Sequence, residues 1–127
     1  MKELILCERE ESSMASTWDE YLVLRLKDDG SYLLFTGKFE VLEDASGYWN
    51  DETEDYDLPD EIDGKEVLWV KDGYVIGGDL DYYNAEEAVE FKEANSKTVR
   101  DWLEATAWSD DVDIGDVAEG IEKIQTQ

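Results

Sequence analysis

The acidic side chains are the residues of this chain best suited to chemistry, and that chemistry is charge attraction. The 127 residues include 35 Asp and Glu against 11 Lys and Arg, a formal net charge of −24. A net charge of about 2–8 keeps a small domain soluble, and a larger one destabilises the fold through self-repulsion. We therefore expect the excess charge to serve the binding of a positively charged partner protein.

The densest acidic stretch spans residues 43–63, where ten of 21 residues are Asp or Glu and none is Lys or Arg. It also carries Tyr48, Trp49 and Tyr56, and interface hot spots favour Trp and Tyr. Loops longer than ~12–15 residues are uncommon unless functional or disordered, so this segment is predicted to meet the partner. Alternatively, the rings anchor the segment to its own core. The residues assigned to the partner-binding surface are Trp49, Asp51, Glu52, Glu54, Asp55, Tyr56, Asp57, Asp60, Glu61, Asp79 and Asp81.

The spacing of the acids fits a mimic of nucleic acid. Alternate residues of an extended segment lie ~6.8 Å apart, and i, i+4 residues of a helix ~5–6 Å apart. B-DNA shows a phosphate every ~3.4 Å of axis per strand, and further apart along the backbone itself. The pairs with these spacings are Glu52/Glu54, Asp55/Asp57, Asp79/Asp81, Asp111/Asp113 and, on a predicted helix, Glu86/Glu90.

Catalytic and metal-binding signatures are incomplete. Histidine, the commonest general base and metal ligand, is absent. Cys7 stands in an apolar stretch and is predicted to be a core residue. Residues 51–62 and 111–122 partly match a calcium loop, but Ile62 takes the twelfth place of the first and Asp116 the glycine place of the second. We expect no enzyme activity, no cofactor and no dedicated metal site.

The compartment and the excluded partners follow from composition. The first eight residues hold too short an apolar run for a signal peptide, and no stretch approaches the ~20 apolar residues of a membrane span. A single cysteine forms no internal disulfide, which is typical of a reducing cytoplasm. A surface this negative is repelled by anionic lipid and by nucleic acid. We expect a cytoplasmic protein that binds neither directly.

The first two-thirds of the chain has strand patterns. Leu22, Leu24 and Leu26 alternate with Tyr21, Val23, Arg25 and Lys27, so the two sets face opposite sides of a sheet. Asp-Gly pairs at residues 29–30 and 72–73 predict tight hairpin turns. The predicted strands are Lys2–Cys7, Tyr21–Lys27, Tyr32–Leu42 (core face Leu33, Phe35, Phe39 and Val41), Val67–Val70 and Tyr74–Ile76.

The remaining third has helix patterns. Asn84 with Glu87 has the form of a capping box and predicts a helix to about Asn95. Ser96 and Asp113 are the predicted caps of two more helices. Their predicted core-facing residues are Val99, Trp102, Leu103, Thr106 and Ala107 in one, and Ile114, Val117, Ile121 and Ile124 in the other.

Strands followed by helices predict a single α+β domain over residues 1–127. It has an antiparallel sheet of about 4–5 strands with two Asp-Gly hairpins, and C-terminal helices packed on one face. The function these features favour is an acidic inhibitor that occupies the basic nucleic-acid-binding surface of a target protein, as anti-restriction and anti-CRISPR DNA mimics do. The alternatives are an immunity protein that neutralises a basic nuclease toxin, and an acidic chaperone of a basic protein.

Overall fold

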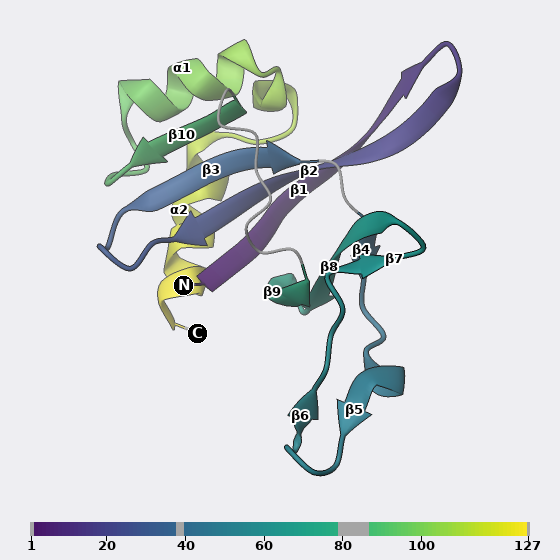
Figure 1. The fold of residues 1–127 in the computed structure, drawn as a ribbon. Helices are drawn as coiled ribbons and strands as arrows, with labels where there is room; N and C mark the ends of the chain where they lie inside the picture. Colours follow the sequence, from purple (N-terminus) through teal and green to yellow (C-terminus); the bar gives the residue numbers. More distant parts are fainter. Residues whose placement is uncertain (1, 38–39, 79–86, 127) are drawn as a thin grey trace.

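The structure is a computed structural model that describes residues 2–37, 40–78 and 87–126. Within them, eight strands form one sheet in the order β10-β3-β2-β1-β9-β8-β4, with β7 paired to β8 (Figure 1). The predicted α+β class is confirmed, but the sheet is larger than predicted. The elements are β1 Lys2–Ser13, β2 Ser16–Leu26, β3 Tyr32–Gly37, β4 Glu40–Leu42, η1 Ser46–Tyr48, β5 Trp49–Asn50, β6 Asp55–Tyr56, β7 Glu61–Ile62, β8 Lys65–Lys71, β9 Tyr74–Gly78, β10 Ala88–Phe91, α1 Lys97–Ala105, η3 Trp108–Asp110 and α2 Ile114–Thr126.

The predicted alternation along β2 places its side chains in two separate cores. Leu22 and Leu24 are fully buried in a cluster that also contains the buried side chains of α1 and α2. Val23, on the other face, is buried with Phe35 of β3 and with Leu68 of β8. The sheet therefore curls, so that the helices cover one face of β1–β3 while β8 and its neighbours cover the other (Figure 1).

The hairpin of β1 and β2 is much longer than the predicted strand Lys2–Cys7. The two strands pair from Lys2 with Leu26 to Ser13 with Ser16, with one shift of register between Ile5 and Cys7. Only the half of this hairpin nearest the body has a third strand beside it, because β3 pairs with β2 from Leu26 no further than Tyr21. The outer half extends from the body as a two-stranded arm (Figure 1). Its polar sequence lacks the apolar alternation from which the other strands were predicted.

The third predicted strand, Tyr32–Leu42, differs from the structure in its length and in the direction of its pairing. Tyr32–Leu42 is not one strand, because β3 ends at Gly37 and β4 is a separate element. β4 pairs with β8 in parallel, so the sheet is mixed rather than wholly antiparallel. Of the predicted core face, Phe35 is buried and Leu33 and Val41 pack against the same cluster, whereas Phe39 lies outside the described residues.

The predicted helix from Asn84 to Asn95 is wrong where the structure describes it. Residues 88–91 form β10, which pairs antiparallel with β3. Val89 and Phe91 pack on the helix-side core, while Ala88 faces the other core. Asn84 and the first part of the predicted helix lie outside the described residues.

Both C-terminal helices begin at the predicted caps. The Ser96 hydroxyl accepts a hydrogen bond from the Val99 N–H at 3.3 Å. Asp113 accepts from the Asp116 N–H at 2.9 Å, and the Asp116 carboxylate accepts in return from the Asp113 N–H at 3.0 Å. The predicted core faces are confirmed except at the end of α1, because the helix ends at Ala105 and Ala107 is exposed with a φ of 63°.

The turn of the β8–β9 hairpin has the predicted Asp-Gly geometry. Asp72 and Gly73 have φ angles of 55° and 87°. Positive φ at both central residues is the requirement of the hairpin turn whose twist matches the flanking strands. Among the described residues, no helix has the length and apolar character needed to cross a membrane.

Candidate functional site

The acidic segment 43–63 is folded, and a small core of its own holds it to β8. Ala45, Val67 and Trp69 are buried in this cluster, and Leu58 packs against it. Tyr48 contacts Trp69 edge-on with ring centroids 5.0 Å apart. The predicted anchoring of the segment by its own aromatic residues is therefore confirmed for Tyr48.

The other two aromatic residues of the segment point outward. Trp49 and Tyr56 are cross-strand partners in the β5–β6 hairpin, with ring centroids 5.0 Å apart at 73°. Their exposed fractions are 48% and 41%. Figure 1 shows this hairpin projecting away from the sheet. An exposed pair of large rings is costly in water, so it is a natural anchor for a partner.

Hydrogen bonds hold the carboxylates of three acids near the two rings. The Trp49 indole N–H donates to Asp51 at 2.7 Å, and the Asn50 amide donates to Asp57 at 2.8 Å. The Asp55 carboxylate accepts from the N–H of Tyr56 at 2.8 Å. The five acids between residues 49 and 57 are all exposed. We call residues 49–57 the acidic hairpin: Trp49 and Tyr56, with Asp51, Glu52, Glu54, Asp55 and Asp57.

One acid pair of the acidic hairpin, Glu52/Glu54, does not have the extended form on which its predicted phosphate-like spacing rested, whereas Asp55 of the Asp55/Asp57 pair lies in strand β6. Residues 51–54 form the turn, and Glu54 has a φ of 55°, so Glu52 and Glu54 are not alternate residues of a strand. The helical pair Glu86/Glu90 is also wrong, because Glu90 belongs to β10. Glu86 lies outside the described residues. The acids form a compact cluster at a hairpin tip instead of a regular row.

The remaining predicted site residues divide into two groups. Asp60 and Glu61 are exposed near the base of the segment, where the Asp60 carbonyl accepts from the Val67 N–H at 3.1 Å. Asp79 and Asp81 lie outside the described residues. The structure thus brings seven of the predicted acids and both exposed rings into one segment beside β8, with five acids at its tip.

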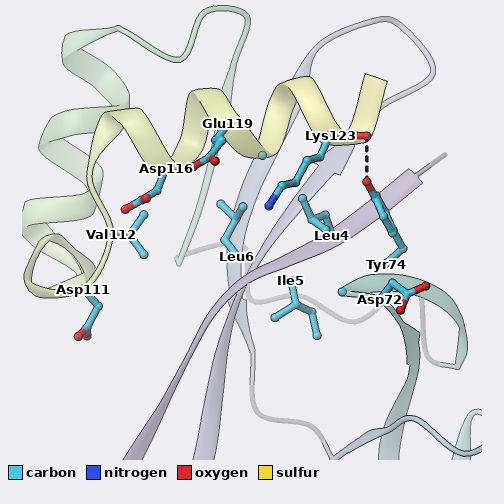
Figure 2. Close-up of a pocket in the computed structure, with 12 residues that line it drawn as sticks. Leu4, Ile5, Leu6, Asp72, Tyr74, Asp111, Val112, Asp116, Glu119 and Lys123 are labelled. Carbon is cyan, nitrogen blue, oxygen red and sulfur yellow. Dashed lines mark hydrogen bonds between the residues drawn. The ribbon is translucent and has the colours of Figure 1, made fainter. Parts of the chain in front are cut away.

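A second acidic surface lies on the helix side of the sheet, and sequence reasoning missed it. It is a groove of about 440 Å³ between β1, the β8–β9 turn and α2 (Figure 2). We call it the acidic groove. Its lining residues are Leu4, Ile5, Leu6, Asp72, Gly73, Tyr74, Asp111, Val112, Asp116, Glu119, Gly120 and Lys123.

A bulge in β1 shapes the floor of the acidic groove. The pairing register with β2 shifts between Ile5 and Cys7, so Leu6 and Cys7 both face the helix side. Burial raises the pKa of the Cys7 thiol, and the charges of Asp111 and Asp116 raise it further. Cys7 is half-buried against the core, as the sequence predicts.

Known proteins offer no family for this chain. No family model, curated protein or solved structure matches it. In the part of the chain that the structure describes, no three Cys, Asp or Glu side chains are grouped so as to hold a metal ion. The acidic hairpin and the acidic groove are therefore the features of the described chain that bear on its function.

Proposed function

We propose that this protein is an acidic inhibitor that covers the basic nucleic-acid-binding surface of a target protein, with the acidic hairpin as its principal contact. The observation that carries the proposal is the placement of five exposed acids around the exposed rings of Trp49 and Tyr56. Charge draws the partner in, and the rings supply apolar area that leaves water on contact.

The acids and the aromatic rings of the acidic hairpin are expected to affect different steps of binding. Complementary charge at the rim of an interface acts mainly on the association rate and its salt dependence. Buried aromatic anchors act mainly on the dissociation rate. The hydrogen bonds from Trp49 to Asp51 and from Asn50 to Asp57 hold the hairpin in one arrangement before binding. That preorganisation lowers the entropy cost of binding.

The test uses a resin of double-stranded DNA loaded with a lysate of the source organism. The protein is added at low salt, and the proteins released from the resin are identified. The hairpin variant carries Asp51→Asn, Glu52→Gln, Glu54→Gln, Asp55→Asn and Asp57→Asn, whose amide oxygens still accept the hairpin's hydrogen bonds. A control variant loses five exposed charges elsewhere, through Glu10→Gln, Glu93→Gln, Glu104→Gln, Asp110→Asn and Glu122→Gln.

The wild-type protein and the control variant are expected to release a basic DNA-binding protein, and the hairpin variant to fail. With the released protein in hand, the hairpin variant should associate about 10-fold or more slowly at low salt, with a shallower salt dependence. Trp49→Ala should instead speed dissociation. Equal release by the two variants would refute the role of the hairpin. If nothing is released and the protein is instead retained on the resin by a DNA-bound nuclease, the immunity-protein alternative would be favoured.

A further inference from the structure

The outer half of the β1–β2 hairpin, residues 8–19, has an open strand edge, and we call it the arm. β9 pairs with β1 only at Leu4, and the Ile5 N–H donates to the Gly73 carbonyl at 2.9 Å in the β8–β9 turn. Beyond this point, β2 is the only described strand that pairs with β1. Over residues 7–13, the backbone N–H and C=O groups directed away from β2 therefore have no partner strand within the described chain.

An open two-stranded ribbon is an unusual feature in a folded domain. Two strands alone are marginally stable in water, and natural proteins cover, shorten or block exposed edges because such edges pair readily with other chains. The arm projects from the body (Figure 1) and contains no proline, since Pro59 is the only one in the chain. The arm therefore keeps the backbone groups that an added strand needs.

Arg9 fixes the base of the arm to the helical layer. Its Nη2 atom lies 3.5 Å from Glu20 Oε1 and 3.4 Å from the Thr106 carbonyl oxygen. Its guanidinium carbon lies 4.2 Å from the ring centroid of Trp108, which is fully buried. Its Nε lies 2.9 Å from Glu11 Oε1, so the charges on this face of the arm are paired with one another. A base held in this way reduces the entropy lost when a partner binds.

The opposite face of the arm is acidic and lacks this compensation. Glu8 and Glu10 are alternate residues of β1, and Asp19 is the cross-strand partner of Glu10. All three are exposed, and none forms an ion pair with another described residue. Burial raises the pKa of Tyr21 to about 12, with contributions from the charges of Glu8 and Asp19. A strand added at the open edge therefore meets unbalanced negative charge at alternate positions.

We propose that the open edge of β1 in the arm binds an extended segment of a basic partner protein as an added strand, with lysine or arginine at alternate positions beside Glu8 and Glu10. Main-chain hydrogen bonds supply affinity, and cross-strand ion pairs select the segment. A second copy of this chain is a poor occupant, because it brings the same acids and a net charge of −24.

This second contact rests on the proposed function, because it takes the same kind of basic partner. The test uses a synthetic peptide and leaves the acidic hairpin intact, so the two proposals can fail separately. The full-length protein is titrated at low salt with an acetylated and amidated peptide of alternating lysine and valine, about seven residues long. Amide proton–nitrogen correlation spectra should show shifts centred on residues 7–13. Alternate amides there, those directed away from β2, should become protected from hydrogen exchange.

Control peptides separate strand addition from charge attraction. A block peptide with all lysines before all valines keeps the charge but loses the alternation. Two further peptides are N-methylated at every lysine or at every valine, and each loses the N–H donors of one edge because alternate residues direct their N–H groups to the same edge. The block peptide and at least one methylated peptide are expected to bind about tenfold or more weakly than the alternating peptide.

Two variants separate the arm from the general negative field. Glu8→Gln with Asp19→Asn removes two charges from the acidic face of the arm, and Glu93→Gln with Glu104→Gln removes two exposed charges elsewhere. The first variant is expected to weaken the alternating peptide roughly fivefold, and the second to change its binding little. Equal binding of all four peptides would overturn the proposal, as would equal weakening by both variants or shifts without protection from exchange. Shifts centred on residues 49–57 would also overturn it and assign the basic segment to the acidic hairpin.

Discussion

The sharpest thermodynamic prediction concerns the buried ion pair of Glu3 in β1 and Arg25 in β2. The two residues are cross-strand partners in β1 and β2 and are 4% and 6% exposed. The Arg25 Nε and Nη2 atoms lie 2.9 and 2.7 Å from Glu3 Oε1, and the guanidinium lies over the Phe35 ring at 5.0 Å. Glu3→Gln keeps the size of the side chain but removes the negative charge that Glu3 supplies to a buried cation.

The expected cost of Glu3→Gln is about 3–5 kcal/mol, the usual result of breaking a buried pair by removing one partner. For a chain of this length an unfolding entropy of about 2.1 cal/mol/K per residue corresponds to roughly 4 °C per kcal/mol, so Tm should fall by about 12–20 °C. Replacing both residues with methionine should cost much less, because it removes both desolvated charges.

Thermal and urea unfolding measure the differences in Tm and in unfolding free energy between wild type and variants. The measurements are made in 0.5 M NaCl, which screens the long-range repulsion among the acidic side chains. Glu10→Gln is the matched control, since Glu10 is exposed on the same strand and faces Asp19 across the hairpin. It should leave Tm unchanged or raise it slightly, because it removes a like-charge cross-strand pair. A cost below about 1 kcal/mol for Glu3→Gln, or a double variant as unstable as the single one, would refute the reasoning.

Two further predictions concern charge and turns. The Ser31 hydroxyl and N–H both donate to Asp29 and hold the pKa of that carboxyl below its ordinary value of 3.8. A lowered folded-state pKa gives stability that is present above the unfolded pKa and is lost as the pH falls through the folded one. Urea unfolding should therefore show Asp29→Asn destabilised relative to wild type at pH 7 and less so at pH 3; equal differences would contradict this. Second, Tm at neutral pH should rise when ~0.3–0.5 M sodium or choline chloride screens the excess charge, and a fall in both salts would mean that paired carboxylates dominate.

The features that the sequence predicts correctly are those determined by neighbouring residues. The alternation of Tyr21–Lys27, the Asp-Gly turn at residues 72–73 and the caps at Ser96 and Asp113 each depend on a few adjacent side chains. Local geometry decides such patterns, because a strand alternates faces at every residue and a cap needs one oxygen near free N–H groups. The concentration of acids and rings in residues 43–63 is visible in the sequence for the same reason, because these residues are contiguous, but the β5–β6 hairpin within them was not predicted.

The errors come from pairings between distant segments. The local sequence of residues 84–91 favours a helix start, but β10 gains its ladder from β3, more than fifty residues earlier. The sequence of neither strand alone indicates that β4 pairs with β8 in parallel. The acidic groove is also non-local, since it depends on the bulge in β1 and on the close approach at Gly120.

The β8–β9 hairpin links the two acidic surfaces and determines how they can act together. Val67 and Trp69 of β8 anchor the acidic segment, and the Asp72–Gly73 turn at the end of β8 lines the acidic groove. These positions are separated by on the order of 15 Å of strand. The screening length is about 8 Å at physiological ionic strength and about 30 Å at 0.01 M. At low salt a basic partner of the kind proposed would therefore meet one continuous negative field, whereas at physiological salt the two acidic surfaces would act on it separately.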